Sequence, residues 1–270
     1  VGSKNQELLL SEVKTNMNEI MTRESQLINQ RLKAISTSAM VLQNDHSHFF
    51  ETLSSQAFPS THPEFTMHSD GTYYKSQDNG GSSVIYMNIT KIGEKEREKA
   101  LKTENFDTLY KSIQKSDPNI AAVYLNTYDS MNRLYPFIPD VLKTYEHNMS
   151  IPSFNFYYEA DATHNPSKKP VWTSAYLDPA GNGWMVSCIA PVYNKGFLEG
   201  VIGIDLTIDA LIKNVLSLKL PWDAKAILVD KQGMILAMPS SVEELLELKE
   251  LRSHVYKSTV KQDTIKPEEF

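Results

Sequence analysis

The sequence predicts an α+β protein in which a long N-terminal helix precedes two modules built on antiparallel sheets. Three observations predict this class. Residues 4–54 carry apolar side chains at helical spacing, with no Gly or Pro among them. Residues 172–207 have the pattern of three strands joined by tight turns. Residues 224–237 then repeat, on a smaller scale, the strand–turn–strand pattern of residues 73–87.

Length and composition limit the possible classes of protein. The chain has 270 residues, of which 41% are hydrophobic, so it can bury one or two ordinary cores, and its length favours two. A net charge of −6 and scattered Lys and Arg residues argue against a nucleic-acid surface. No window approaches the ~20 apolar residues of a membrane span, and no signal-peptide pattern follows Val1, so the chain as given is expected to be soluble. The single Cys188, in a predicted strand, is expected to be a buried, inert thiol.

The N-terminal helix is longer than one domain of this size requires. About fifty residues at a rise of ~1.5 Å each give a rod of about 75 Å. Polar residues interrupt its apolar seam, which argues against a perfect coiled coil. We therefore expect a helix that packs on its own domains and ends before Pro59 and Pro63, and a homodimer contact through it remains open. His46 and His48 lie two residues apart and so point to different sides of the helix, which does not favour a metal site.

The next elements alternate between strands and a helix. Thr72–Lys75 and Ser83–Met87 flank the turn Asp78-Asn-Gly-Gly81 and predict a hairpin. Glu94–Lys115 is an amphipathic helix that ends at Asp117-Pro118. The segments Ala121–Asn126 and Arg133–Phe137 are predicted strands.

Residues 139–170 form an irregular, aromatic-rich connection. Long connections in compact domains are usually functional or disordered, and the density of aromatic residues argues against disorder. Its Phe156, Tyr157 and Tyr158, together with Trp172, are candidates for a lid over the sheet. The alternative is that they are core residues.

The strongest anomaly in the chain is Asp205, which lies in the predicted strand Leu198–Thr207. That strand follows Trp172–Leu177 and Trp184–Val192 in an antiparallel meander. Alternation places Ile202, Ile204 and Leu206 on a core face, and Val201, Gly203 and Asp205 on the other. Because Gly203 has no side chain, a ligand could approach the sheet beside the carboxylate. The alternative is that Asp205 caps a helix that begins near Thr207, and the two roles are compatible.

The remaining residues predict an incomplete second module. A helix over Ile208–Leu218 precedes strands at Ala224–Asp230 and Met234–Ala237 and a helix at Ser241–Lys249. Two strands and one helix are too few to close a core. This module is therefore either truncated or completed by the long N-terminal helix.

The order of these elements and their motifs resembles one family. The chain resembles the double Cache (tandem PAS-like) extracytoplasmic sensor domains of bacterial histidine kinases and chemoreceptors. The segments that carry this resemblance are Tyr176-Leu-Asp178, Gly183-Trp184, Pro191-Val-Tyr193 and Gly200-Val-Ile-Gly203-Ile-Asp205. The resemblance implies a signalling helix at 1–58, a membrane-distal ligand-binding module at 59–218 and a membrane-proximal module at 219–270. It also implies transmembrane segments and a cytoplasmic signalling region, most simply that of a histidine kinase. This domain would then face the periplasm or the outside of a bacterial inner membrane.

The resemblance also implies where a ligand binds. Members that bind amino acids share an Arg-x-Trp-Tyr segment for the carboxylate, and a Tyr-x-Asp and a strand Asp for the amine. Here the Arg is missing, because the matching passage is Phe154-Asn-Phe156-Tyr157. The carboxylates and aromatic rings that remain suit a cationic or amine-bearing small molecule. The expected ligand-binding residues are Asp205, Tyr176, Asp178, Tyr157, Tyr158, Trp172 and Phe156.

Two of these residues have plain structural alternatives. Asp178 is also placed to begin a type I turn. Tyr176 could instead form a cross-strand aromatic pair with Trp184.

The expected function is ligand sensing rather than catalysis. The sequence shows no catalytic, phosphate-binding or paired-cysteine motif, and we expect no catalytic residue, metal or cofactor in this domain. Two alternatives stay open. One is an extracytoplasmic hydrolase that uses Asp178 and Asp205 as an acid/base pair. The other is a sensor module that binds no small ligand.

Overall fold

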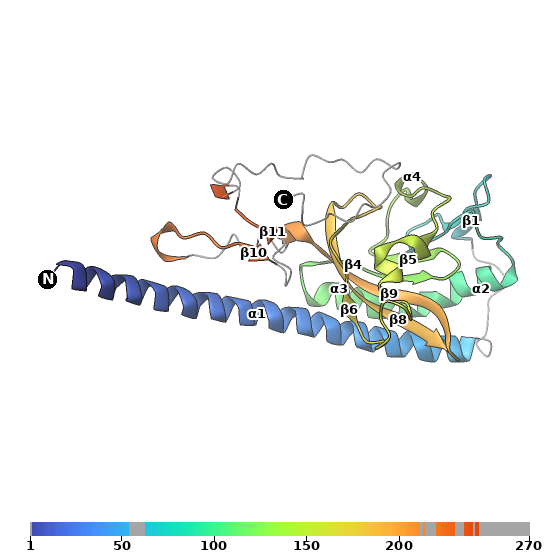
Figure 1. Cartoon of the computed structure of the whole chain (residues 1–270). Coiled ribbons are helices and arrows are strands. Elements are labelled where there is room, and N and C mark those ends of the chain that lie inside the picture. The colour runs from blue at the N-terminus through green and yellow to red at the C-terminus, as the bar shows by residue number, and fades with distance from the viewer. Residues whose placement is uncertain are drawn as a thin grey trace.

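A computed structural model describes residues 2–53, 63–210, 213, 220–229, 235–239 and 241–242. Its most extended element is the helix α1, Gly2–Thr52, which runs along one side of the molecule and beyond it toward the N-terminus (Figure 1). The predicted N-terminal helix is therefore confirmed. Among the residues described, no helix combines the length and the hydropathy needed to cross a lipid bilayer.

A single antiparallel sheet forms the centre of the fold. Its strand order is β1-β2-β3-β5-β4-β9-β8-β6, and β7 pairs separately with β8. The strands are β1 Phe65–Met67, β2 Tyr73–Lys75, β3 Ser83–Tyr86, β4 Ile120–Thr127, β5 Met131–Tyr135, β6 Val171–Trp172, β7 Tyr176–Leu177, β8 Trp184–Asn194 and β9 Phe197–Thr207. The predicted α+β class with an antiparallel sheet is confirmed.

Helices cover one face of this sheet. They are α2 Glu94–Lys102, the 3₁₀ helix η2 Thr103–Phe106, α3 Asp107–Ser116 and the C-terminal part of α1 (Figure 1). The core between these helices and the sheet includes Leu42, Phe106, Tyr110, Val123 and Ile204. The single predicted helix over Glu94–Lys115 is thus real, but a 3₁₀ turn divides it.

Short helical turns cover the other face. They are α4 Val141–Thr144, η3 Ile151–Ser153 and α5 Asn155–Tyr158. With Ile85, Tyr124 and Met185 of the strands, they form a second buried cluster. The irregular aromatic segment predicted from the sequence is therefore ordered and lies against the sheet.

The long helix contacts the sheet only through its C-terminal half. Ile35 is the first buried apolar residue among those described in α1, whereas Leu8, Leu9, Leu10 and Leu27 are exposed. The Gln43 amide donates hydrogen bonds to the backbone carbonyls of Pro191 and Lys168, at 2.7 and 2.8 Å. α1 is thus fixed to β8 on the helical face of the sheet.

His46 is a core residue of this interface. It stacks on Phe106, and its two ring nitrogens contact the Leu42 carbonyl and the Tyr110 hydroxyl, each at 2.7 Å. Burial lowers its pKa to about 3, so the imidazole is neutral in the fold. Its packing leaves no role in a metal site with His48.

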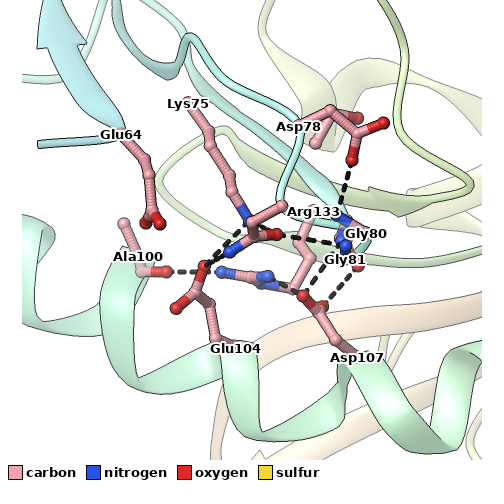
Figure 2. Close-up of polar contacts among 12 residues, drawn as sticks. Glu64, Lys75, Asp78, Gly80, Gly81, Ala100, Glu104, Asp107 and Arg133 are labelled. Carbon is pink, nitrogen blue, oxygen red and sulfur yellow. Dashed lines mark hydrogen bonds and ion pairs between the residues drawn. The ribbon is translucent and has the colours of Figure 1, made fainter. Parts of the chain in front are cut away.

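A buried ion-pair network ties the helices to the first strands (Figure 2). Arg133 of β5 is fully buried, and its guanidinium donates to Asp107 Oδ1, Thr103 Oγ1 and the Ala100 carbonyl. Asp107 also accepts hydrogen bonds from the Ser82 amide and hydroxyl. Beside it, the buried Lys75 pairs with Glu104 at 2.9 Å. Both cations are therefore compensated by carboxylates and polar groups.

The C-terminal residues of the chain lie largely outside the described part. The strands β10 Leu228–Val229 and β11 Ile235–Ala237 form an antiparallel pair after the 3₁₀ helix η4 Pro221–Asp223. The predicted strand pair is thus confirmed in part. Most of the predicted helices Ile208–Leu218 and Ser241–Lys249 falls outside the described residues.

The network around Arg133 gives a stability prediction. Asp107→Ala leaves a fully buried guanidinium without its carboxylate, and we expect a loss of about 3–5 kcal/mol of unfolding free energy in urea denaturation. Lys143→Ala is the control, because it removes an ion pair whose two side chains are mostly exposed, and it should change stability by less than about 0.5 kcal/mol. Equal effects of the two substitutions would contradict this role of the network.

Candidate functional site

The site is organised on the hairpin of β8 and β9. Ser187 pairs with Asp205, and Ile189 pairs with Gly203, on the face away from α1. Between them, Cys188 and Ile204 face α1 and belong to the helical core. The predicted alternation of β9 is therefore correct, and each strand carries core residues on one face and site residues on the other.

Asp205 is buried among hydroxyl groups. Its side chain is 4% exposed, and its Oδ1 accepts hydrogen bonds from Ser187 Oγ at 2.5 Å and Tyr176 OH at 3.3 Å. The two hydroxyls also contact each other at 2.7 Å. Both contacts reach the same carboxyl oxygen. The helix that follows is capped by another residue, because Thr207 Oγ1 accepts the Ala210 amide at 3.1 Å.

Burial dominates the electrostatics of Asp205. Desolvation, followed by the nearby charge of Asp178, raises its pKa to about 8, although the bonds from Ser187 and Tyr176 oppose the shift. Burial also raises the pKa of Asp178. At neutral pH the Asp205 carboxyl group is therefore mostly protonated.

A small cavity lies beside this carboxyl group. It has a volume of about 30 Å³, which is room for a water molecule or two. Neither Lys nor Arg is present among the described residues that line it. The lining residues are Met87, Tyr124, Asn126, Asn132, Leu134, Tyr145, Met149, Ile151, Phe156, Tyr176, Asp178, Pro179 and Asp205.

Two buried polar atoms of this lining lack a partner within the described part of the chain. They are the Tyr124 hydroxyl and the Asn132 Oδ1. Leaving a buried polar group unsatisfied costs about 1–3 kcal/mol, so such groups usually indicate a bound water or ligand. The cavity therefore offers two carboxyl groups and further oxygen acceptors.

Gly203 leaves the space that Tyr124 occupies. A Cβ atom at this position would lie 2.1 Å from Tyr124 Cζ and 2.2 Å from its hydroxyl oxygen. The missing side chain therefore accommodates the protein's own tyrosine rather than opening the sheet to solvent.

Asp178 has a structural role as well as a place in the cavity wall. Its Oδ1 accepts the Ala180 amide, and its Oδ2 accepts the side-chain and backbone amides of Asn182. It therefore holds the turn between β7 and β8, as its position in the sequence suggested. Tyr176 pairs with Met185 rather than with Trp184.

The structure brings together only part of the predicted set. Asp205, Tyr176, Asp178 and Phe156 line the cavity, whereas Tyr157, Tyr158 and Trp172 do not. Tyr157 is a buried core residue, and the Tyr158 ring packs against His164. Trp172 lies on the opposite face, where its indole N–H donates to Ser36 of α1 at 3.2 Å. The lid interpretation is therefore wrong for Trp172.

A shift in register explains the position of Trp172. β6 pairs Trp172 with Cys188, whereas β7 pairs Tyr176 with Met185. Between the two strands, the pairing with β8 slips by one residue. Such a slip reverses the face of every later side chain, so Trp172 and Tyr176 point to opposite sides. The sequence predicted one continuous strand here.

Sequence reasoning missed several residues of the cavity wall. Tyr124, Asn126 and Asn132 come from β4 and β5, and Tyr145 and Met149 come from the irregular segment. The available signal was the presence of Asn in or beside apolar strands, where it is depleted. That signal identifies polar positions but not which sheet face they share.

The described residues form a PAS-like α+β fold in which a small cavity lies on the sheet face opposite the long helix. Residues 107–213 match the family described as methyl-accepting chemotaxis protein-like, first PDC sensor domain. The resemblance to double Cache extracytoplasmic sensor domains is confirmed by this match together with the fold. No curated protein sequence matches the chain.

Solved structures show the same fold at low sequence identity. The sensory domain of the Campylobacter jejuni chemoreceptor Tlp3 with isoleucine bound aligns at a TM-score of 0.52 and 17% identity, covering 93% of this chain and 78% of that one. The Tlp3 ligand-binding domain with 4-methylisoleucine aligns at 0.50 and 16% identity, covering 93% and 74%. The complex of that domain with L-valine aligns at 0.50 and 17% identity, covering 92% and 78%.

The raised pKa of Asp205 gives a prediction about stability. Between about pH 4 and 8 the unfolded chain loses this proton while the folded chain keeps it, so unfolding is favoured as pH rises. The free energy of unfolding of the wild type should therefore fall relative to Asp205→Asn by up to about 1.4 kcal/mol per pH unit across this range. Urea denaturation from pH 4 to 8 measures the difference. Parallel pH profiles would mean that Asp205 has the same pKa in the folded and the unfolded chain.

Proposed function

We propose that this chain is the extracytoplasmic ligand-sensing region of a transmembrane receptor in a bacterial inner membrane. In this proposal residues 1–58 are the signalling helix, residues 59–218 the membrane-distal ligand-binding module and residues 219–270 a membrane-proximal module. The family match over residues 107–213 and the likeness to chemoreceptor sensor domains support a sensing role. Its periplasmic or outward-facing location follows from the same likeness.

The groups that line the cavity indicate which class of ligand it would bind. Asp205 and Asp178 supply carboxyl groups, and the aromatic rings of Phe156 and Tyr176 lie 5.2 Å apart beside them. With neither Lys nor Arg among the described lining residues, a carboxylate ligand would lack a charged partner. A small molecule with an ammonium or other positive group finds both ion pairing and cation–π contact. We therefore propose a cationic or amine-bearing ligand.

Ligand entry requires the cavity wall to move. A volume of about 30 Å³ is too small for an amino acid or an amine of similar size. We expect the irregular segment that includes Tyr145, Met149 and Ile151 to be the part of the wall that moves. It contributes no strand to the sheet, so its displacement breaks no pairing between strands. A ligand that binds the opened wall better than the closed one shifts the population toward it.

The opposite faces of β8 and β9 give this shift a path to α1. Ser187 contacts Asp205, and its neighbour Cys188 lies against Ser36 of α1. Leu42 and Ile204 pack in the same core. A displacement of the β8–β9 hairpin would therefore alter the packing of α1 on it. The continuous helix would transmit that displacement along its length.

The context of the whole receptor is also part of the proposal. The likeness to chemoreceptors supports membrane tethering and a cytoplasmic output region, which is either a histidine kinase or a chemoreceptor-like signalling region. The exposed Leu8, Leu9 and Leu10 support a homodimer through α1. Sedimentation of the protein tests this point, since a monomer at all concentrations would contradict it.

A hydrolase is the weaker candidate. Both oxygens of Asp178 accept hydrogen bonds from the donors of its own turn, so this carboxyl group is poorly placed to exchange a proton with a substrate. The groups around Asp205 are hydroxyls and aromatic rings. They do not form the chain of nucleophile, base and orienting group that a hydrolase uses. The domain is better suited to non-enzymatic sensing.

Binding of a permanently charged ligand gives a prediction about pH. A panel of small quaternary ammonium compounds avoids titration of the ligand itself, and a cation that pairs with Asp205 must displace its proton. The affinity should therefore rise by up to about tenfold per pH unit below pH 8 and then level off. Isothermal titration calorimetry between pH 6 and 9 measures this dependence and the proton released.

Two variants separate binding from folding in that experiment. Asp205→Asn should fold, lose ammonium binding and release no proton. Asp209→Asn, at an exposed position nearby, should bind as the wild type does. Tight binding to Asp205→Asn, or equal affinity for a neutral tert-butyl analogue, would refute the cationic ligand. Chemical conversion of an added compound by the wild type but not by Asp205→Asn would instead favour the hydrolase.

A further inference from the structure

A second cluster of chemically active side chains lies away from the cavity, at one edge of the sheet. His68 and Asp70 belong to the turn between β1 and β2, and His147 belongs to the loop after α4. Asp70 is held between the two imidazoles: its Oδ1 lies 2.9 Å from His68 Nδ1, and its Oδ2 lies 2.5 Å from His147 Nδ1. One ligand atom from each residue lies within 4.8 Å of the others.

Outer contacts hold these three side chains in position. The Leu142 carbonyl accepts a hydrogen bond from His147 Nε2 at 2.8 Å, which fixes the orientation of the ring. His147 Nδ1 faces Asp70, and it would give up its proton when a metal ion binds there. The Thr72 amide donates to Asp70 Oδ1 at 3.0 Å. The Asn88 amide donates to the His147 carbonyl at 2.7 Å, so the loop itself is tied to the strand region. Metal-ligating histidines are usually held by second contacts of this kind.

We propose that His68, Asp70 and His147 form a binding site for a divalent transition-metal ion of the zinc class. Two imidazole nitrogens and one carboxylate oxygen are a ligand set that such ions prefer, and a fourth position stays open to water. Ligands about 2.1 Å from a shared ion lie at most about 4.2 Å apart, so small rotations of the side chains close the set. The side chains are 40%, 32% and 20% exposed, which leaves the ion a path from solvent.

Occupation of this site would join two parts of the domain. Two ligands lie on the β1–β2 turn, and the third lies between Tyr145 and Met149, both of which line the cavity. A bound ion would therefore restrain the wall that a ligand must displace. This consequence for ligand affinity rests on the proposed function, whereas the metal site itself does not.

The test is zinc binding by untagged protein that has been treated with EDTA and freed of it. Isothermal titration calorimetry with zinc chloride should show one site per chain, and thermal denaturation should show a rise in Tm with zinc but not with magnesium. Asp70→Asn and His147→Ala should each weaken zinc binding at least about tenfold. His68→Gln changes the most exposed ligand. It tests the site without disturbing the loop that holds His147, and it should also weaken zinc binding.

His164 supplies the matched control. Its Nδ1 lies 2.8 Å from Asp161 Oδ1 in an exposed pair. Among the described residues, this pair has no third ligand close enough to complete a metal site, so His164→Ala should leave zinc binding unchanged. Cobalt absorption in the visible range should be lost in the three site variants and kept in this control. Absence of zinc binding, or equal binding by wild type and all three site variants, would overturn the proposal. Either result would leave the ammonium-binding test of the cavity unaffected.

Discussion

The burial of one carboxyl group on the inner face of β9 is the constraint on which the rest of the site depends. Asp205 is buried within the sheet, where a charge is largely removed from solvent, and its two hydrogen-bond partners are neutral hydroxyls. The fold therefore holds this group as an acid whose pKa is raised to about 8. A positive charge beside it would supply what solvent does not. The cavity, the unpartnered acceptors of Tyr124 and Asn132, and the exclusion of Lys and Arg from its described lining all agree with that requirement.

The same strands explain how a buried site can influence a distant element. Each residue of β9 that faces the cavity has neighbours that face α1, and Ser187 and Cys188 show the same division on β8. The buried network of Arg133 and Asp107 fixes α3 to β5 on the helical face (Figure 2). The cavity wall, by contrast, consists of short turns rather than sheet. In the proposed sensing mechanism, the wall and the hairpin move and α1 is displaced along its C-terminal half.

Much of the fold could be predicted from the sequence, because its elements follow strong local patterns. Uninterrupted helical spacing gave α1, and alternation in Val201–Leu206 placed Asp205 away from the core formed by Ile202 and Ile204. The site was only partly predictable. The one-residue slip between β6 and β7 moved Trp172 to the other face, and neither propensity nor alternation reveals such a slip. Tyr124 and Asn132 reach the cavity through pairing of strands distant in sequence, and the link between Asp70 and His147 spans 77 residues.

The most direct test of this account is the titration of Asp205 itself. Carbon-13 NMR of the aspartate carboxyl groups, with Asp205→Asn used to assign the resonance, follows its ionisation in the ligand-free protein from pH 3 to 9. We expect a midpoint near pH 8, and a downward shift of that midpoint when a quaternary ammonium ligand is bound. A midpoint near 4 in the free protein, unchanged by any cation, would contradict it.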